Sequence, residues 1–272
     1  MIEIALAALV GLLVGSFLNV CVFRLPRDLS VVRPRSFCPA CEKPIAWHDN
    51  IPVLSYILLR GRCRSCRERI SLRYPLVELA TAAAFGVCMA ALGPSLKSLK
   101  YSLFSAILIT LIASDLEERI LPDEFTLGGT VAGLALAAFV PMDFGFAHIL
   151  LPQFLGPRWL SVGEAALGAA VSSGSIWLVG TMYQRLRHRE GLGFGDVKMI
   201  AMIGTFLGLN GALLTMIAAS LVGAVSGLIY VFVTGKDAST YELPFGSFLG
   251  LAGLAVAMFG DVVVVWYSRA GN

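Results

Sequence analysis

The sequence has few charged residues. Asp, Glu, Lys and Arg make up 14% of its 272 residues, 57% are hydrophobic, and the mean hydropathy is +0.79. A water-soluble domain carries roughly a quarter charged residues. The composition therefore excludes a soluble globular domain and predicts a polytopic membrane protein.

Two familiar signals are also missing. The first apolar stretch has Glu3 where a secretory signal peptide has a basic region, and no small-residue cleavage site precedes Cys21, so we expect a retained helix. The polar segment 24–74 contains no glycine-rich loop of the usual nucleotide-binding type and is too short for such a fold. A nucleotide-like cofactor would need a site of another kind.

About eight apolar stretches approach the length that crosses a bilayer. They cover residues 3–23, 75–92, 96–114, 125–142, 162–182, 197–210, 211–233 and 244–267. The sixth is short and runs into the seventh at Leu209-Asn210-Gly211, so a re-entrant segment or a tight helical hairpin is an alternative there. We predict an all-α membrane protein with about eight transmembrane helices, organised as a first helix (1–23), an insert (24–74) and a membrane core (75–272).

The basic residues predict the orientation. More than half of the 21 Lys and Arg residues lie in 24–74, and most of the others fall in the turns near 115–124, 183–198 and 234–243. Because positive loops stay in the cytoplasm, the insert is expected there, with the N-terminus outside. The basic turn at 185–189 is expected to contact anionic lipid.

The insert contains two C-x-x-C motifs, Cys38-Pro39-Ala40-Cys41 and Cys63-Arg64-Ser65-Cys66. Each short loop can present two thiolates to one tetrahedral ion, so the pair predicts a structural zinc site. Disulfides are the first alternative, and the cytoplasmic placement argues against them. A redox dithiol is the second.

Three further residues could be confused with metal ligands. His48 lies between the two motifs and could replace one cysteine, although four thiolates already complete a closed site. Cys21 and Cys88 stand alone in apolar stretches, where cysteine packs as a small hydrophobic residue.

Two aspartates, Asp115 and Asp196, lie where long apolar stretches give way to short polar ones. A carboxylate at a membrane boundary is costly unless a partner, water or a function offsets the cost. Gly191, Gly193 and Gly195 would let the backbone before Asp196 approach another element and adopt conformations closed to other residues. Both carboxylates are expected at the cytoplasmic face.

A facing pair of aspartates would suit peptide hydrolysis. Like-charge repulsion leaves one proton shared between the two carboxyl groups. The ionised one can then activate a water molecule while the other polarises the peptide carbonyl, as in aspartic proteases. Taken singly, Asp196 could instead cap a helix, and Asp115 could pair with Arg119.

Several motifs occur in the order found in one family. They are Gly15-Ser16-Phe17-Leu18-Asn19-Val20, Arg24-Leu25-Pro26, the two C-x-x-C motifs, Asn50-Ile51-Pro52, Arg73-Tyr74-Pro75-Leu76-Val77-Glu78, the turn from Asp115 to Asp123, Gly193-Phe194-Gly195-Asp196-Val197-Lys198 and Pro244-Phe245-Gly246. Over residues 11–250 the chain resembles the bacterial type IV prepilin peptidases.

The resemblance implies an activity and partners. Asp115 and Asp196 match the catalytic aspartates of a family that removes the basic leader from prepilins and pseudopilins at the cytoplasmic face of the bacterial inner membrane. Members with the cysteine-bearing insert typically also methylate the new N-terminus with S-adenosylmethionine. Components of a pilus or of type II secretion are further expected partners, and no nucleic acid is expected.

Four residues are candidates for supporting roles. Glu78 could hold cationic groups, or it could simply start a helix at the interface. Lys198 could tune Asp196 or anchor the chain at the headgroups. Gly61 and Arg62 are candidates for cofactor binding, and the alternative is that they only shape the zinc-binding motif.

Two non-enzymatic alternatives remain at this stage. Intramembrane carboxylates beside glycine-broken helices also build the sites of ion-coupled transporters. The transporter is disfavoured because both aspartates lie at one face, and no inverted repeat is visible in the motif order. The insert could also make the protein a scaffold for pilus assembly, with or without catalysis.

Overall fold

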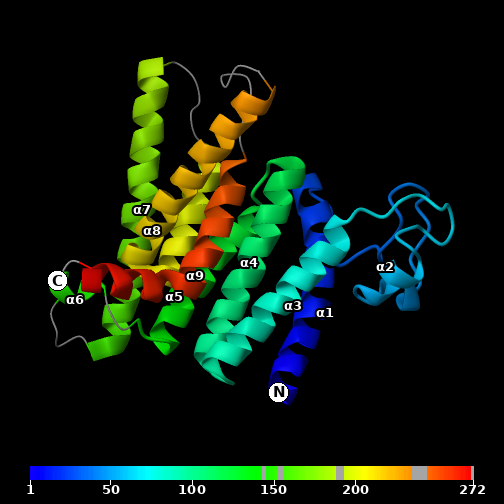
Figure 1. The fold of residues 1–272 in the computed structure, drawn as a ribbon, viewed down its shortest axis with the longest axis horizontal. Coiled ribbons are helices and arrows are strands. Elements are labelled where there is room, and N and C mark those ends of the chain that lie inside the picture. Colours follow the sequence, from blue (N-terminus) through cyan, green and yellow to red (C-terminus); the bar gives the residue numbers. More distant parts are fainter. Residues whose placement is uncertain (143–144, 152–155, 188–192, 235–243, 271–272) are drawn as a thin grey trace. The chain divides into compact units, whose positions relative to one another are not determined.

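The computed structural model describes residues 1–142, 145–151, 156–187, 193–234 and 244–270. The chain forms two compact units, Met1–Glu118 and Arg119–Asn272, which are treated separately below (Figure 1). Within the described ranges every regular element is a helix, apart from two isolated β-bridges in the insert. The all-α prediction is confirmed.

The first unit is built on three long helices, α1 (Ile2–Arg24), α3 (Arg73–Leu92) and α4 (Leu96–Glu118), each of which packs on the other two. Glycines allow α1 and α3 to touch through their backbones. A Cβ added at Gly11 would lie 2.7 Å from the Cα of Ala82, and one at Gly15 would lie 2.7 Å from the Cα of Glu78. Such small-residue contacts are typical of helix pairs in membranes.

The insert joins α1 to α3 at the end of α1 away from the N-terminus (Figure 1). Its elements are η1 (Leu25–Arg27), η2 (Trp47–Asn50) and α2 (Leu54–Leu58). The buried guanidinium of Arg24 fixes its first part, because it donates hydrogen bonds to the carbonyls of Ser30 (2.8 Å), Pro34 (2.8 Å) and Arg35 (3.3 Å).

The second unit consists of the remaining helices. They are α5 (Asp123–Phe139), α6 (Ala147–Leu150), α7 (Gly156–Arg187), α8 (Phe194–Thr234) and α9 (Phe245–Ala270). Helix α8 is central and packs on α5, α7 and α9. A Cβ at Gly204 of α8 would lie 2.4 Å from the carbonyl carbon of Gly168 in α7, so these two backbones are in direct contact.

Helix α8 is broken at Gly208, whose φ of 71° and ψ of −177° are not helical. Glu164 of α7, only 1% exposed, compensates for the break. One carboxylate oxygen accepts the N–H of Leu209 (3.0 Å) and the other accepts the N–H of Ala147 in α6 (2.8 Å). The carboxylate thus accepts hydrogen bonds from backbone N–H groups that have no partner within their own helix, at the break in α8 and at the start of α6.

The predicted spans correspond to the observed helices. Within the described ranges, five helices, α1, α3, α4, α7 and α8, are long and apolar enough to cross a membrane, so this is a multi-pass membrane protein. At 1.5 Å per residue, the 41 residues of α8 would exceed a bilayer of about 30 Å, so its two arms correspond to the predicted spans 197–210 and 211–233. The division between them is at Gly208 and not at Leu209-Asn210-Gly211.

Candidate functional site

Asp115 lies in the last turn of α4 and is 6% exposed. The helix continues to Glu118, one turn beyond the end of the predicted span. Both ends of the insert are ion-paired to this last turn, because Arg27 pairs with Glu118 and Arg73 pairs with Glu117. The segment that carries Asp115 is therefore held by the same unit that carries the insert.

Asp196 is the third residue of α8 and is 9% exposed. It lies inside the first helical turn and is therefore not the N-cap residue considered above. Its N–H donates to the carbonyl of Gly193 (3.1 Å). A carboxylate in the first turn is stabilised by the positive end of the helix dipole.

The glycines before Asp196 act through packing. A Cβ at Gly195 would lie 3.2 Å from Cδ1 of Leu121, which is a tight contact, so the close approach is present. The expected special backbone conformation is not observed at these two positions, since neither Gly193 nor Gly195 has a positive φ. Gly191 lies outside the described residues.

Lys198 connects the starts of two helices in the second unit. Its Nζ lies 2.5 Å from Oδ1 of Asp123, the first residue of α5, and 5.1 Å from the ring centre of Phe194. The side chain is 22% exposed. Lys198 thus fixes the beginning of α8, the turn that carries Asp196, to the beginning of α5.

The four cysteines of the insert form a cluster. The sulfurs of Cys38, Cys41, Cys63 and Cys66 all lie within 4.8 Å of one another, and the Sγ atoms of Cys38 and Cys66 are 3.8 Å apart. Four sulfurs placed tetrahedrally about 2.3 Å from a zinc ion would be separated by about 3.8 Å. The cluster therefore fits a metal ion, and all six cysteines of the chain are free thiols.

The two C-x-x-C motifs have the same backbone design. In each, the N–H of the first cysteine donates to the carbonyl five residues on, at Lys43 (3.0 Å) and at Glu68 (2.8 Å). In each, the residue after the second cysteine has a positive φ, 57° at Glu42 and 62° at Arg67. The chain thus builds one metal-binding turn twice.

Hydrogen bonding prepares Cys63 for a metal. Backbone N–H groups of Cys66 and Ser65 lower the pKa of the Cys63 thiol to about 7. The thiolate is the form that binds metal ions. Burial and hydrogen bonds to the other cysteines raise the pKa of the Cys66 thiol to about 12, so ionisation within the cluster is favoured at Cys63.

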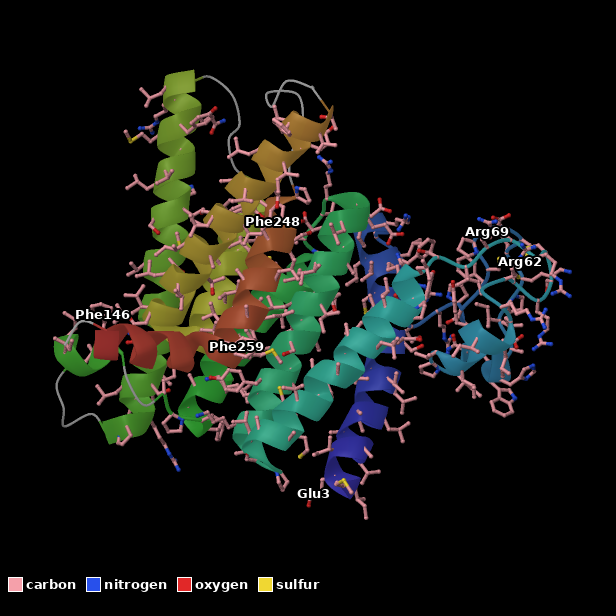
Figure 2. All side chains as sticks on the ribbon, viewed as in Figure 1. Glu3, Arg62, Arg69, Phe146, Phe248 and Phe259 are labelled. Atoms are coloured by element: carbon pink, nitrogen blue, oxygen red, sulfur yellow. The ribbon has the colours of Figure 1, made fainter. Side chains whose placement is uncertain are left out.

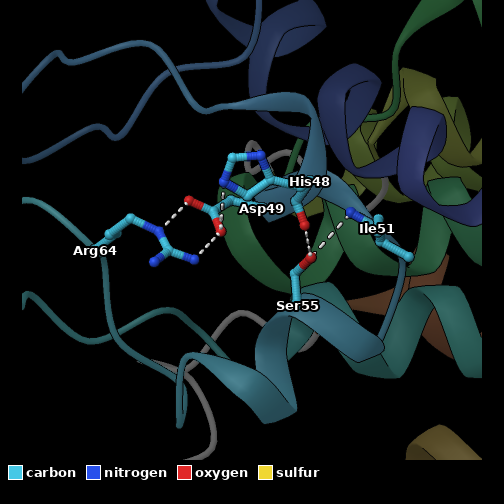
Figure 3. Close-up of polar contacts among 5 residues, drawn as sticks. All are labelled: His48, Asp49, Ile51, Ser55 and Arg64. Carbon is cyan, nitrogen blue, oxygen red and sulfur yellow. Dashed lines mark hydrogen bonds and ion pairs between the residues drawn. The ribbon is translucent and has the colours of Figure 1, made fainter.

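The segment between the two motifs is held by polar contacts (Figure 3). Asp49 accepts two hydrogen bonds from Arg64, from Nε at 2.7 Å and Nη2 at 2.6 Å, and Arg64 lowers the pKa of the Asp49 carboxyl. Ser55 donates to the carbonyl of His48 (2.9 Å) and accepts the N–H of Ile51 (3.0 Å). These contacts tie the second motif and α2 to η2.

His48 is not part of the cysteine cluster. Its side chain is 52% exposed and packs edge-on against Trp47. Cys21 and Cys88 are both buried in helices of the first unit, as expected for packing residues.

Glu78, Gly61 and Arg62 differ in their surroundings. Glu78 is 7% exposed, and its carboxylate accepts the N–H of Val53 (2.7 Å) beside a cavity of the first unit. Gly61 and Arg62 do not line this cavity. Gly61 has a φ of 65°, and a Cβ there would meet the hydroxyl of Tyr56 at 2.8 Å, while Arg62 is exposed beside Arg69 (Figure 2).

Two further residues that line this cavity, Asn19 and Val53, had no predicted role. Asn19 is 1% exposed, and Val53 has a φ of 59°, which is unusual for a β-branched residue. An asparagine inside an apolar stretch is a visible signal, because a buried amide needs partners. The strained backbone at Val53 leaves no comparable trace in the sequence.

Comparison with known proteins agrees with this picture. Residues 9–92 match the model of the Bacterial Peptidase A24 N-terminal domain, and residues 102–228 match that of the Type IV leader peptidase family. No solved structure matches the chain.

Several curated relatives share the name Prepilin leader peptidase/N-methyltransferase. The protein of Aeromonas hydrophila is 34% identical over 97% of this chain and 93% of its own length, and that of Neisseria gonorrhoeae is 33% identical over 96% and 92%. The protein of Myxococcus xanthus is 39% identical over 83% of this chain, which spans 62% of that relative's length. The chain belongs to the type IV leader peptidase family.

Proposed function

We propose that this chain is a membrane enzyme with two activities. It removes the basic leader of type IV prepilins or pseudopilins at the cytoplasmic face of the inner membrane, and it methylates the new N-terminal amine. Membership of the leader peptidase family carries the first activity, and the name shared by the relatives supports the second.

For peptide cleavage we assign Asp115 and Asp196 as the catalytic pair. One ionised carboxylate takes a proton from water, and the water oxygen adds to the peptide carbonyl carbon while the protonated carboxyl group polarises the carbonyl oxygen. The C–N bond then breaks as the leaving nitrogen gains a proton. The products are a leader carboxylate and a free pilin amine.

Gly193, Gly195 and Lys198 have supporting roles in this proposal. Gly193 accepts the N–H of Asp196, Gly195 packs closely on Leu121, and Lys198 is bound to Asp123. All three fix the first turn of α8. They therefore orient Asp196 and do not take part in bond breaking.

The charge pattern supports the proposed orientation. The insert and three short polar segments of the sequence hold most of the basic residues, which favours the cytoplasmic side for Asp115 and Asp196. A prepilin has an apolar helix after its leader, so it would enter from the bilayer with its scissile peptide at this face. Anionic lipids are the expected contacts of the basic turns.

The cysteine cluster is proposed as a structural zinc site. Four thiolates favour zinc over magnesium or calcium, and a closed set of four leaves no position for a substrate. Metal binding would supply folding free energy to an insert with little core of its own.

Methylation needs S-adenosylmethionine, which supplies an electrophilic methyl group when bound. The fit of this chain to such a ligand rests on the cavity beside Glu78, where the buried amide oxygen of Asn19 has no hydrogen-bond partner among the residues that the structure describes. The amine must lose one proton as it gains the methyl group. In this proposal Glu78, which lines the cavity, accepts that proton, whereas Gly61 and Arg62 shape the second cysteine motif.

Neither non-enzymatic alternative gains support. The family models and the relatives point to a peptidase, and nothing in them favours an ion-coupled transporter or a scaffold. A docking role with pilus or type II secretion components remains compatible with catalysis.

Intact-mass analysis of a purified prepilin tests the proposal. The substrate is incubated with the protein in detergent, with and without S-adenosylmethionine. We expect leader loss in both samples and one added methyl group only with the cofactor. An unchanged prepilin mass with folded, metal-loaded protein would contradict the peptidase.

A further inference from the structure

The first unit contains a cavity of about 570 Å³ between the insert and the adjoining parts of α1 and α3. This volume is typical of pockets that hold a small ligand, which range from about 300 to 1,000 Å³. Asn19 and Glu78 line it from the two helices, and Asp49, Tyr56 and Cys63 line it from the insert. The cavity therefore exists only when the insert is folded against the helices.

Asn19 brings an unused hydrogen-bond acceptor to this cavity. Its Nδ2 donates to the carbonyls of Gly15 (3.2 Å) and Tyr74 (3.0 Å), which fixes the orientation of the amide. Its Oδ1 is buried, with no partner in the part of the chain that the structure describes. Buried acceptors in proteins are normally paired, so a donor from a ligand is the natural complement.

Glu78 adds a negative charge next to the same helix contact. Tyr74 and Glu78 are one turn apart on α3, as Asn19 and Gly15 are on α1, and the backbones touch at Gly15 and Glu78. Among the described residues Glu78 makes no ion pair. Nearby Arg24 donates to backbone carbonyls, and Arg73 pairs with Glu117, although the buried Nε of Arg73 has no hydrogen-bond partner within the described part of the chain.

The backbone against Glu78 is strained. Val53 has a φ of 59° and a ψ of −47°, and Leu54 donates to the carbonyl of Pro52 at 2.5 Å. This is the rare γ-turn with positive φ, which is unfavourable for a β-branched residue. Glu78 accepts the N–H of Val53 and so holds the turn. Strain of this kind clusters at ligand-binding sites.

We propose that this cavity binds a primary α-amine, with Asn19 Oδ1 and the Glu78 carboxylate as its acceptors. An ammonium group offers three donors and a positive charge, which matches one neutral and one anionic acceptor. The inference rests on the proposed methylation, whose reactants both carry such a group. They are the amino-acid end of S-adenosylmethionine and the N-terminus of the cleaved pilin.

The test measures binding to the full-length, zinc-loaded protein in detergent. One arm uses labelled S-adenosylhomocysteine in equilibrium dialysis. The other uses a labelled pilin peptide with a free N-terminal phenylalanine, compared with the same peptide N-acetylated. The variants are Asn19→Leu, which removes the acceptor, and Glu78→Gln, which keeps an acceptor for Val53 but removes the charge.

Thr81→Val is the matched control. Thr81 is fully buried on α3, three residues after Glu78, and donates only within its helix, to the carbonyl of Val77 (2.8 Å), without lining the cavity. Zinc content and gel-filtration behaviour check the fold of each variant. Should Asn19→Leu fail to fold, Glu78→Gln carries the test alone.

We expect both variants to weaken one ligand by about 10-fold or more, the usual effect of losing one charge-assisted hydrogen bond, while the control binds normally. Weaker S-adenosylhomocysteine binding identifies the methyl donor as the occupant, and weaker binding of the free-amine peptide alone identifies the acceptor. Unchanged affinity for both ligands in the folded variants would overturn the inference, even if the wild type methylates pilin. A wild type that binds neither ligand and never methylates would overturn the proposed methylation as well.

Discussion

The two compact units are held together in different ways. In Met1–Glu118 the insert depends on side-chain chemistry, which includes four clustered thiols, the Asp49–Arg64 pair and the three carbonyl contacts of Arg24. In Arg119–Asn272 the helices depend on close packing, as at Gly168 and Gly204, and on one buried carboxylate at Glu164. The insert of the first unit is thus sensitive to metal and charge, and the helix packing of the second unit is sensitive to side-chain volume.

The two proposed catalytic residues come from different units, Asp115 from the first and Asp196 from the second. Replacing either Asp115 or Asp196 by Asn keeps the side-chain volume but removes the ionisable group. We expect the cleavage rate to fall by about 1,000-fold or more, since acid–base catalysis contributes about 100- to 10,000-fold. Initial rates on a purified prepilin measure the effect. Near-normal cleavage by either folded variant would remove that residue from the mechanism.

Metal removal should affect only the first unit strongly. Cys38→Ser, or treatment with a chelator, is expected to release the metal, unfold the insert and abolish methylation. Cleavage should persist in large part, because the pairs Arg27–Glu118 and Arg73–Glu117 lie outside the cysteine motifs. Cys88→Ser is the control, since Cys88 lies in α3 away from the cluster. Methylation by fully metal-free protein would contradict this role for the cluster.

Added volume at Gly204 should affect only the second unit. Gly204→Ala forces a methyl group against the backbone of Gly168 and should destabilise the unit by about 1–3 kcal/mol, as overpacking usually does. Thermal unfolding in detergent measures this, with bound zinc expected to be unchanged. Gly128→Ala is the control, because a Cβ there meets nothing within 4 Å. Equal melting temperatures for the two variants would argue against the close contact.

The smallest expected effect concerns the ion pair in the insert. Because Arg64 lowers the pKa of Asp49 from its usual 3.8, the carboxylate stays ionised as the pH falls, and its contribution to stability is lost only below that value. The Asp49→Asn variant should therefore have a slightly lower melting temperature than the wild type, and the difference should be the same at pH 7 and at pH 5. If the difference in melting temperature between variant and wild type became smaller from pH 7 to pH 5, another titrating group would control the pair.

Local patterns in the sequence predicted much of this molecule. The helical spans follow from apolar runs, and the metal cluster follows from two C-x-x-C spacings, because each motif positions two of its thiols through contacts within a few residues. The family resemblance was confirmed by the matched models. The roles of Asp115 and Asp196 stay predictions.

Features that depend on distant contacts were not predictable in this way. The break at Gly208 is stabilised by Glu164, which lies 45 residues from Leu209 in the chain. The cavity beside Asn19 requires α1, α3 and the insert together, and the strain at Val53 is tolerated because Glu78 holds its N–H. No periodicity or spacing rule encodes such pairings.

The central claim is that this chain performs two reactions at separable sites. The most direct test is a crossed intact-mass experiment with uncut prepilin and pre-cut pilin, using Asp196→Asn and the metal-free wild type, each with S-adenosylmethionine. The account predicts that Asp196→Asn leaves prepilin uncut but methylates pre-cut pilin, and that the metal-free protein cleaves without methylating. Loss of both reactions in each folded sample would contradict separate sites.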